Sequence, residues 1–361
     1  MKNSYWDAMD ALRFTPEQKA DMVEHLLSAP AAGKVVRPLR FRRFAAAGAA
    51  AALVLSLGVA GATGALGSAG EAFAGLFGGG AAETEIIDQI GYPIGASATS
   101  NGVTITADAI VGDTYSYAIV YSIRRDDGEP LVSQEVLESG DNALPLTFDS
   151  HDVTPGNPLA VLLGGGGGGY SRFYDADPND NAIQFMEVWT FSSPIRPGKV
   201  TATFQGLYEA SEDYLDKELL AEGPWKLEFH MAFEDSSVSL PAGQDFTLNG
   251  MDATLDGVTL SPLSIQVDYT VHQELVWSEN RESGRENEYD REQSYRYFES
   301  LPVVITYTDG TTQDLTNAGG GITPGDGETV CQKSRIFDEL RPLDEVASVT
   351  VGDIVLPVSA G

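Results

Sequence analysis

Apolar and polar residues alternate over many short stretches of this chain. Tyr115–Ile123 and Leu263–Val271 place a large apolar side chain at every second position, which is the period of a half-buried β-strand. Similar runs, separated by Gly, Pro and Asp, predict further strands; they are Phe185–Phe191, Lys199–Phe204, Lys226–Phe233, Pro302–Tyr307, Ala347–Val351 and Ile354–Val358. We therefore predict that the chain after residue 84 is mostly β.

Two segments of this region form an internal repeat. Asn101–Ile123 and Asn249–Val271 align without a gap at an offset of 148 residues, with six of 23 positions identical. Each begins with an Asn-Gly pair, typical of a hairpin turn, and both keep the same inward phase. A slip of one residue would turn either apolar face to solvent. The repeat predicts two tandem antiparallel β-sandwiches, which we place at residues 84–234 and 235–361.

A long uncharged stretch precedes the β region. Phe44–Gly70 contains no charged residue in 27 positions, and about 20 predominantly apolar residues suffice to cross a bilayer as a helix. Four basic residues stand directly before it; they are Arg37, Arg40, Arg42 and Arg43. Because basic flanks stay cytoplasmic, we predict a transmembrane helix over 44–70 with the N-terminus inside, followed by a linker over 71–83.

Two alternatives to this anchor are a buried soluble helix and a cleaved signal peptide. The stretch is rich in Ala and Gly, and both Ala60-Gly61-Ala62 and Ala72-Phe73-Ala74 have the small-x-small pattern of a cleavage site. A preceding region of 43 residues with helix signals of its own is long for a signal peptide. This length favours the membrane anchor.

The basic segment 1–43 carries short helical patterns. Thr15-Pro16-Glu17-Gln18 is a helix-start signature with a capping box. The helix it predicts places Ala20, Val23 and Leu27 on one stripe, and Trp6 and Met9 repeat at helical spacing before it. So few apolar groups cannot form a substantial core. The stripe is expected to contact a partner or the membrane surface; the alternative is an amphipathic stub without a partner.

The charge is divided unevenly between the two ends of the chain. Residues 1–43 contain eight Lys and Arg against five acidic residues, whereas the remainder contains 14 against 48, within a formal net charge of −31. Such an acidic surface repels phosphate backbones, which argues against nucleic-acid binding. The single cysteine, Cys331, excludes an internal disulfide and a Cys-based zinc site.

This arrangement resembles a family of bacterial single-pass membrane proteins of the anti-sigma-factor type, whose outer part is an immunoglobulin-like domain of unknown function (domain of unknown function 4179). The resemblance rests on structural motifs over most of residues 34–361; they are the basic flank and Ala-rich helix, Glu71–Phe77, Asn101–Thr106, Tyr115–Ile123, Gly223–Phe229 and Leu260–Leu263. It implies two immunoglobulin-like sandwiches outside. It also implies that residues 1–43 restrain an extracytoplasmic-function sigma factor, although they contain His25 and no cysteine of the zinc-binding kind of anti-sigma domain.

The motifs of enzymes are missing from the sequence. The four histidines have neither metal-site spacing nor a nucleophile motif beside them, and Gly164–Gly169 lacks the Lys-Ser/Thr of a phosphate-binding loop, which predicts a flexible loop. Asp175, Asp177 and Asn179 start like a calcium loop, but Asp180 and Met186 stand where its turn glycine and bidentate Glu belong. The charged stretch Glu279–Arg296 predicts an exposed hairpin or insertion.

We therefore expect no enzyme, no cofactor and no metal beyond a weak calcium candidate. The leading hypothesis is a transmembrane regulator with an extracytoplasmic sensing region. The alternative is a membrane-anchored module that contacts the cell wall or another protein. The two hypotheses differ in whether residues 1–43 or the β region binds the decisive partner.

Overall fold

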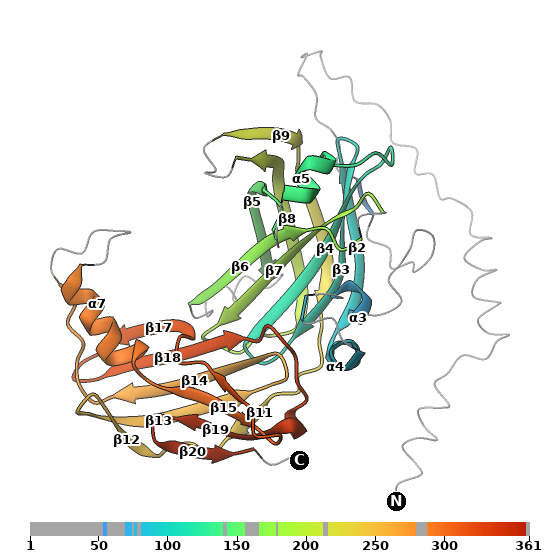
Figure 1. The fold of residues 1–361 in the computed structure, drawn as a ribbon. Coiled ribbons are helices and arrows are strands. Elements are labelled where there is room, and N and C mark those ends of the chain that lie inside the picture. The colour runs from blue at the N-terminus through green and yellow to red at the C-terminus, as the bar shows by residue number, and fades with distance from the viewer. Residues whose placement is uncertain are drawn as a thin grey trace, which may run out of the picture. The chain divides into compact units, whose positions relative to one another are not determined.

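The computed structural model describes residues 53–55, 69–73, 76–77, 81–139, 143–155, 166–177, 180–211, 216–278 and 287–358. Within them the chain is mostly β, as predicted, with twenty strands in four antiparallel sheets (Figure 1). Residues 50–361 belong to one compact unit. We call strands β2–β10 (92–231) the first β-unit and strands β11–β20 (238–357) the second.

The first β-unit has two sheets. One has the order β1-β2-β3-β4-β7-β6, and the other has the order β10-β8-β5, with β9 also paired to β8. The bounds are β1 Leu53–Leu55, β2 Tyr92–Ser100, β3 Val103–Gly112, β4 Ser116–Arg125, β5 Leu146–Pro155, β6 Gly167–Tyr174, β7 Ile183–Phe191, β8 Gly198–Ala210, β9 Lys217–Ala221 and β10 Trp225–Met231. Three helices accompany them, namely α3 Ala69–Ala72, α4 Ala81–Ile90 and α5 Gln134–Ser139.

The second β-unit repeats this plan with shorter strands. Its sheets have the orders β11-β13-β14-β18-β17, with β12 also paired to β13, and β16-β15-β19-β20. The bounds are β11 Val238–Leu240, β12 Asp245–Leu248, β13 Met251–Leu260, β14 Ser264–Val271, β15 Val303–Tyr307, β16 Thr312–Asp314, β17 Gly319–Pro324, β18 Thr329–Ile336, β19 Val346–Val351 and β20 Ile354–Pro357. Helix α7 Glu288–Ser294 continues into a π-helix, η1 Tyr295–Glu299, and a 3-10 turn, η2 Leu343–Glu345, precedes β19.

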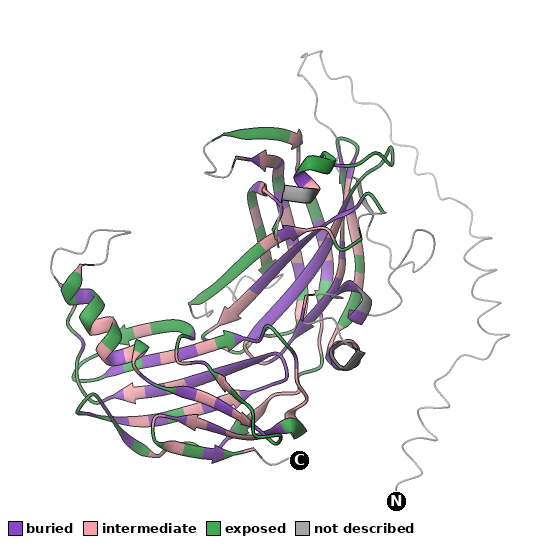
Figure 2. Ribbon diagram, in the orientation of Figure 1, coloured by how far each residue is buried: buried purple, intermediate pink, exposed green. Residues whose placement is uncertain are grey.

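The inward-facing residues of each pair of sheets form one core. Both cores are buried almost completely along the central strands (Figure 2). The first is rich in aromatic rings, with Phe148 in contact with Phe185 and Phe204, and with Trp225 donating its indole N–H to the carbonyl oxygen of Val103 at 2.8 Å. Each large apolar side chain buried in this way contributes about 1.5–3 kcal/mol. The two cores explain why the alternating pattern is so regular on these strands.

The predicted repeat is confirmed in strand position and register. β13 begins and ends 148 residues after β3, and β14 likewise begins 148 residues after β4. The turn residues Asn101 and Asn249 both have positive φ, 48° and 51°, as a tight hairpin turn requires. Each copy then has a β-bulge, at Asp108 and Asp256, whose carboxylate accepts a hydrogen bond from the next strand, from Ser122 Oγ at 2.5 Å and Thr270 Oγ1 at 2.7 Å.

One sequence prediction about a loop is wrong. Gly167–Gly169, predicted as a flexible loop, begin the edge strand β6, because pairing with β7 satisfies their backbone groups. The described part of Glu279–Arg296, predicted as an exposed hairpin or insertion, is helical from Glu288 and stands between β14 and β15, so it is an insertion and not a hairpin. There Asn287 caps the helix and the buried Asp290 carboxylate accepts hydrogen bonds from Ser278 and Asn287. These local hydrogen bonds stabilise the start of the helix, although the segment is rich in charged residues.

Only residues 53–55 and 69–70 of the predicted membrane helix lie among the described residues. Leu53–Leu55 form a short strand paired with β2, which differs from the helix predicted there; an otherwise free sheet edge can recruit a short apolar segment in this way. No helix in the described part of the chain is long and apolar enough to cross a membrane. In the predicted linker 71–83, α3 ends at Ala72 and α4 starts at Ala81, so helix rather than plain linker adjoins the first strand.

Candidate functional site

The residues predicted to bind a partner lie outside the described residues. These are Trp6, Met9, Ala20, Val23 and Leu27, together with the flanking Arg37, Arg40, Arg42 and Arg43. Their roles stay predictions. The described site of greatest interest is instead the place where the segment following the predicted membrane helix packs against both β-units.

Helices α3 and α4 fold back on each other and cover the outer face of the first β-unit. The backbone N–H of Gly70 donates to Asp88 Oδ1 at 2.7 Å, which joins the two helices. Glycine is required at two crossing points: a Cβ on Gly70 would lie 2.6 Å from Thr84, and one on Gly91 would lie 2.8 Å from Val111 of β3. Phe73 and Phe77 are buried beneath this pair, with ring centroids 5.8 Å apart.

The buried residues here form a third core that is distinct from the two inner cores. We call it the junction core. Its members come from three parts of the chain: Ala69, Ala72, Phe73, Phe77, Ile86, Ile87 and Ile90 from the α3–α4 segment; Ala109, Val111, Ala118, Val120, Met186 and Val188 from the first β-unit; and Leu263, Ile336 and Leu340 from the second. A displacement of any one part must therefore repack the other two, since close-packed interiors transmit strain.

The buried carboxylate of Asp113 links the two β-units by hydrogen bonds. Asp113 is 2% exposed, and its Oδ1 accepts hydrogen bonds from the backbone N–H groups of Tyr115 and Ser116 at 3.0 and 2.7 Å. Its Oδ2 accepts from the hydroxyls of Ser261 and Ser264 of the second β-unit, both at 2.6 Å. Burial raises the pKa of Asp113, against the four hydrogen bonds that favour its ionised form.

This contact joins equivalent turns of the two repeats. Asp113 and Ser261 are 148 residues apart, and each starts the turn between the two repeated strands with the same backbone hydrogen bond, from its own N–H to the carbonyl oxygen three residues later, at 2.9 Å. Ser261 Oγ accepts from the N–H groups of Leu263 and Ser264, as Asp113 does in its own turn. The longer aspartate has a second oxygen left for the other copy. The repeat is visible in the sequence, but contact between its two turns is not.

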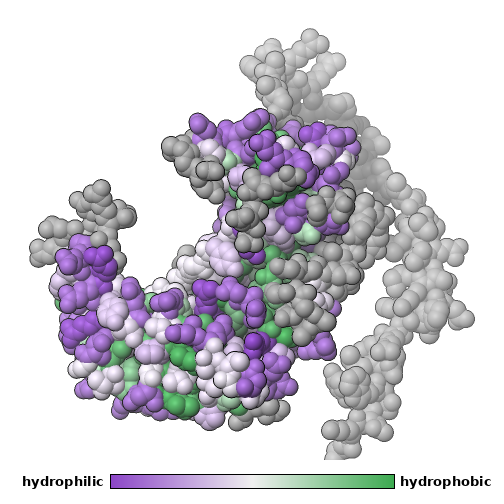
Figure 3. Space-filling model, viewed as in Figure 1, coloured by the Kyte–Doolittle hydropathy of each residue, from purple (hydrophilic) through white to green (hydrophobic). Residues whose placement is uncertain are grey.

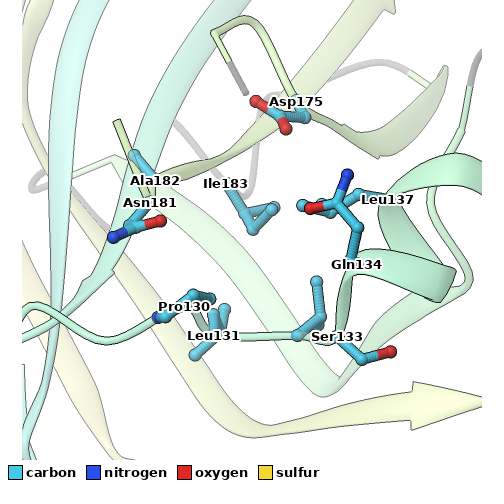
Figure 4. A pocket seen from close by; sticks show the side chains of 10 residues that line it. Pro130, Leu131, Ser133, Gln134, Leu137, Asp175, Asn181, Ala182 and Ile183 are labelled. Atoms are coloured by element: carbon cyan, nitrogen blue, oxygen red, sulfur yellow. The ribbon is translucent and has the colours of Figure 1, made fainter. Parts of the chain in front are cut away.

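Of the calcium candidates, Asp175 lines a cavity of the first β-unit. Asp175 Oδ1 accepts from the N–H of Asp177 at 3.1 Å, an ordinary turn contact, and Asn179 lies outside the described residues. Burial raises the pKa of Asp175. Among the described residues, no group of three or more His, Cys, Asp or Glu side chains is arranged to hold a metal ion. Asp175 lines the cavity together with residues of the α5 region (Figure 4).

Sequence reasoning missed two buried ionisable residues, Glu187 and Lys333, each 1% exposed. The Glu187 carboxylate accepts a hydrogen bond from Tyr121 Oη at 2.6 Å, and burial raises its pKa to about 7. Lys333 Nζ donates to the carbonyl oxygens of Leu301 at 2.9 Å and Thr316 at 2.7 Å, and burial lowers its pKa to about 8. The sequence did carry a signal for both residues, namely their position in the alternating pattern. Each lies two residues from a buried neighbour and therefore on the same inward face of its strand.

The remaining candidates are structural. Cys331 is fully buried in the second core, and burial raises the pKa of its thiol to about 12. His230 is exposed on β10, and His272 follows β14, where its Nε2 lies 2.8 Å from Thr254 Oγ1.

No protein-family model and no curated protein matches the chain. Among solved structures, the chain is similar to a conserved domain protein from Bacillus anthracis, with 14% sequence identity over 72% of this chain and 75% of that chain, and a TM-score of 0.42. A likeness this distant carries no argument about function.

Proposed function

We propose that the chain is a single-pass membrane regulator of the anti-sigma-factor type. Residues 44–70 cross the membrane, which requires Leu53–Leu55 to leave their pairing with β2. Residues 1–43 bind an extracytoplasmic-function sigma factor in the cytoplasm, and the two β-units form an extracytoplasmic sensing region of tandem immunoglobulin-like sandwiches. The uneven charge and the uncharged 27-residue stretch support this topology. The paired antiparallel sheets around one core in each β-unit support the sandwich assignment.

The observation that carries the proposal is the junction core. The α3–α4 segment, which begins at the last two residues of the proposed membrane helix, packs against the first β-unit and shares one apolar cluster with Leu263, Ile336 and Leu340 of the second. A plain tether would need no such contact. A ligand that favours one arrangement of the β-units has differential affinity for two states, which is what a population shift requires, and the α3–α4 segment would carry that shift to the membrane.

The test is a reporter gene under the promoter of the cognate sigma factor, combined with co-purification of that sigma factor with the full-length chain. Leu27→Asp should abolish co-purification and raise reporter activity, because it places an unpaired charge in a buried contact. Glu17→Lys, a charge reversal in the same predicted helix outside the stripe of Ala20, Val23 and Leu27, is the control and should change neither readout.

A second pair of variants tests the junction core. Asp113→Ala removes the bridge to Ser261 and Ser264 and should shift reporter output although residues 1–43 are intact, whereas Asp353→Asn, an exposed acid on the second β-unit, should not. If the wild-type chain retains no sigma factor, the regulator proposal fails and the anchored binding module replaces it. If only Asp113→Ala is silent, the β-units do not signal through the junction.

A further inference from the structure

Ten residues enclose a cavity of about 190 Å³ at one end of the first β-unit. One wall is the segment 130–134 with Leu137 of α5, and the other is the connection between β6 and β7. Figure 4 shows Asp175 on one side of the cavity, with Ile183 and Leu137 between it and Pro130. This volume lies below the range of about 300–1,000 Å³ typical of sites for drug-sized ligands, so a nucleotide is too large for it.

The cavity has an apolar floor and a polar rim. Leu131, Val132, Ala182 and Ile183 are all less than 9% exposed and form the floor. The rim consists of Ser133, Gln134 and Asn181, which are exposed, and Asp175, which is partly buried. Such a site suits a ligand with a short hydrocarbon part and a single polar head.

The charges around the cavity favour a positively charged polar head on the ligand. Asp175 is the only ionisable residue among the ten that line it, and the exposed Glu129 and Glu135 adjoin two others in the chain. Arg124 and Arg125, at the end of β4, are already paired with acids, Arg124 with Asp180 at 3.1 Å and Arg125 with Asp127. A cleft lined by one sign of charge concentrates ions of the opposite sign.

The chemistry of the lining also separates an organic cation from a metal ion. Calcium requires six to eight oxygen ligands, whereas this cavity offers one carboxylate and the neutral side chains of Ser133, Gln134 and Asn181 around a hydrocarbon floor. An alkylammonium group matches both features. Its N–H groups can donate to a carboxylate in charge-assisted hydrogen bonds, and its methylene stem can cover apolar side chains.

We propose that this cavity binds a primary alkylammonium group, with the ammonium on Asp175 and the methylene stem against Leu137 and Ile183. The group is either a free diamine or the side chain of a lysine in a peptide. The inference goes beyond the proposed regulatory function and does not depend on it, since binding is measured without the sigma factor.

The test is isothermal titration calorimetry of the full-length protein with two amines, 1,5-diaminopentane and Nα-acetyl-lysine methylamide. Saturable binding of either supports the proposal, and the one that binds more tightly identifies the source. 1-Pentanol, which has the same stem without the charge, should bind at least about tenfold more weakly, because a charge-assisted hydrogen bond is lost.

Asp175→Asn should weaken amine binding about tenfold or more, while Asp353→Asn, an exposed acid on the second β-unit, should leave it unchanged. A near-ultraviolet circular dichroism spectrum like that of the wild type shows that the Asp175 variant is folded. The proposal is overturned if neither amine binds, if Asp175→Asn binds as tightly as the wild type, or if CaCl₂ displaces the amine at equal concentration.

Discussion

The two β-units have the same turns and the same β-bulge, but they differ in the ionisable side chains that they bury. Both have an Asn-Gly turn, an aspartate bulge and a polar turn residue at an offset of 148. The register places Glu187 opposite Ile119 in the first β-unit and Lys333 opposite Val267 in the second. Because Val267 is the repeat equivalent of Ile119, an acid and a base occupy the same position in the two cores.

These two residues have different structural roles. Glu187 has a tyrosine hydroxyl as its partner, from the equally buried Tyr121. Lys333 donates to three backbone carbonyls, two of them at the end of the π-helix that interrupts the second β-unit, and its ammonium lies 5.0 Å from the ring centroid of Phe298. The two copies thus keep the same strand register although their buried ionisable residues differ. In the first copy Glu187 is a carboxyl group in the core, and in the second Lys333 binds carbonyl groups at the end of a helix.

The largest effect on stability is expected from removing the ammonium group of Lys333. Lys333→Met should lower the free energy of unfolding by about 3 kcal/mol or more, because one buried and two partly buried carbonyl oxygens lose a charged donor. Lys199→Met, which removes a surface ion pair with Glu228, should cost less than about 1 kcal/mol. Urea denaturation of both variants checks the difference. Equal stability of Lys333→Met and the wild type would show that the cation does not hold the helix end.

The next effect is the pH dependence of the first β-unit. Glu187 has a folded-state pKa of about 7 against an ordinary value of 4.5, so between these values the folded state holds a proton that the unfolded state releases. Stability from this group is therefore present at low pH and lost as the pH rises. From pH 5 to pH 8 the wild type should lose roughly 2–3 kcal/mol more than Glu187→Gln, since each unit of pKa shift corresponds to about 1.4 kcal/mol.

Urea denaturation followed by tryptophan fluorescence at the two pH values measures this difference for the full-length chain. Glu228→Gln, a change on the surface of β10, is the control and should not remove the loss of stability at high pH. Parallel curves for the wild type and Glu187→Gln would contradict a protonated Glu187 in the folded state.

The smallest effect concerns the glycine-rich strand β6. A Cβ on Gly169 would lie 2.3 Å from the carbonyl oxygen of Val188 and 2.7 Å from the Trp189 ring, whereas nothing lies within 4 Å of one on Gly168. Gly169→Ala should cost about 1–3 kcal/mol through overpacking, and Gly168→Ala less than about 0.5 kcal/mol. Thermal unfolding of this matched pair checks the result; equal melting temperatures would return Gly167–Gly169 to the status of a loop.

The strands that the sequence predicted are those with an apolar face on a core. All eight predicted strands are present, because alternation records burial directly. Several missed strands are glycine-rich, charged or very short, such as β6, β9 and β16. Hydrogen bonds to a neighbouring strand hold them in place, and such bonds leave no periodic signal in the side chains. Hydrophilic residues accordingly cover much of the visible surface around β9 and α5 (Figure 3).

The candidate sites were harder to predict. The sequence marked Asp175 as a calcium candidate, which stays a prediction, and the structure shows that this residue lines a cavity. Nothing in the sequence marked Asp113, because its importance depends on Ser261 and Ser264, which lie 148 and 151 residues away. Both residues are short, polar and in turns, and such residues are common in this chain.

The sequence by itself determined the β class, the internal repeat, its register and the division of charge between the ends, since each follows from periodicity or composition. Only the tertiary structure decided that the α3–α4 segment shares a core with both β-units, that the two repeated turns meet at Asp113, and that Glu187 and Lys333 are buried at equivalent positions. The physical reason is the distance along the chain over which each kind of information acts. Periodicity reports which face of a strand is buried, whereas contacts between surfaces far apart in the chain depend on how whole elements pack.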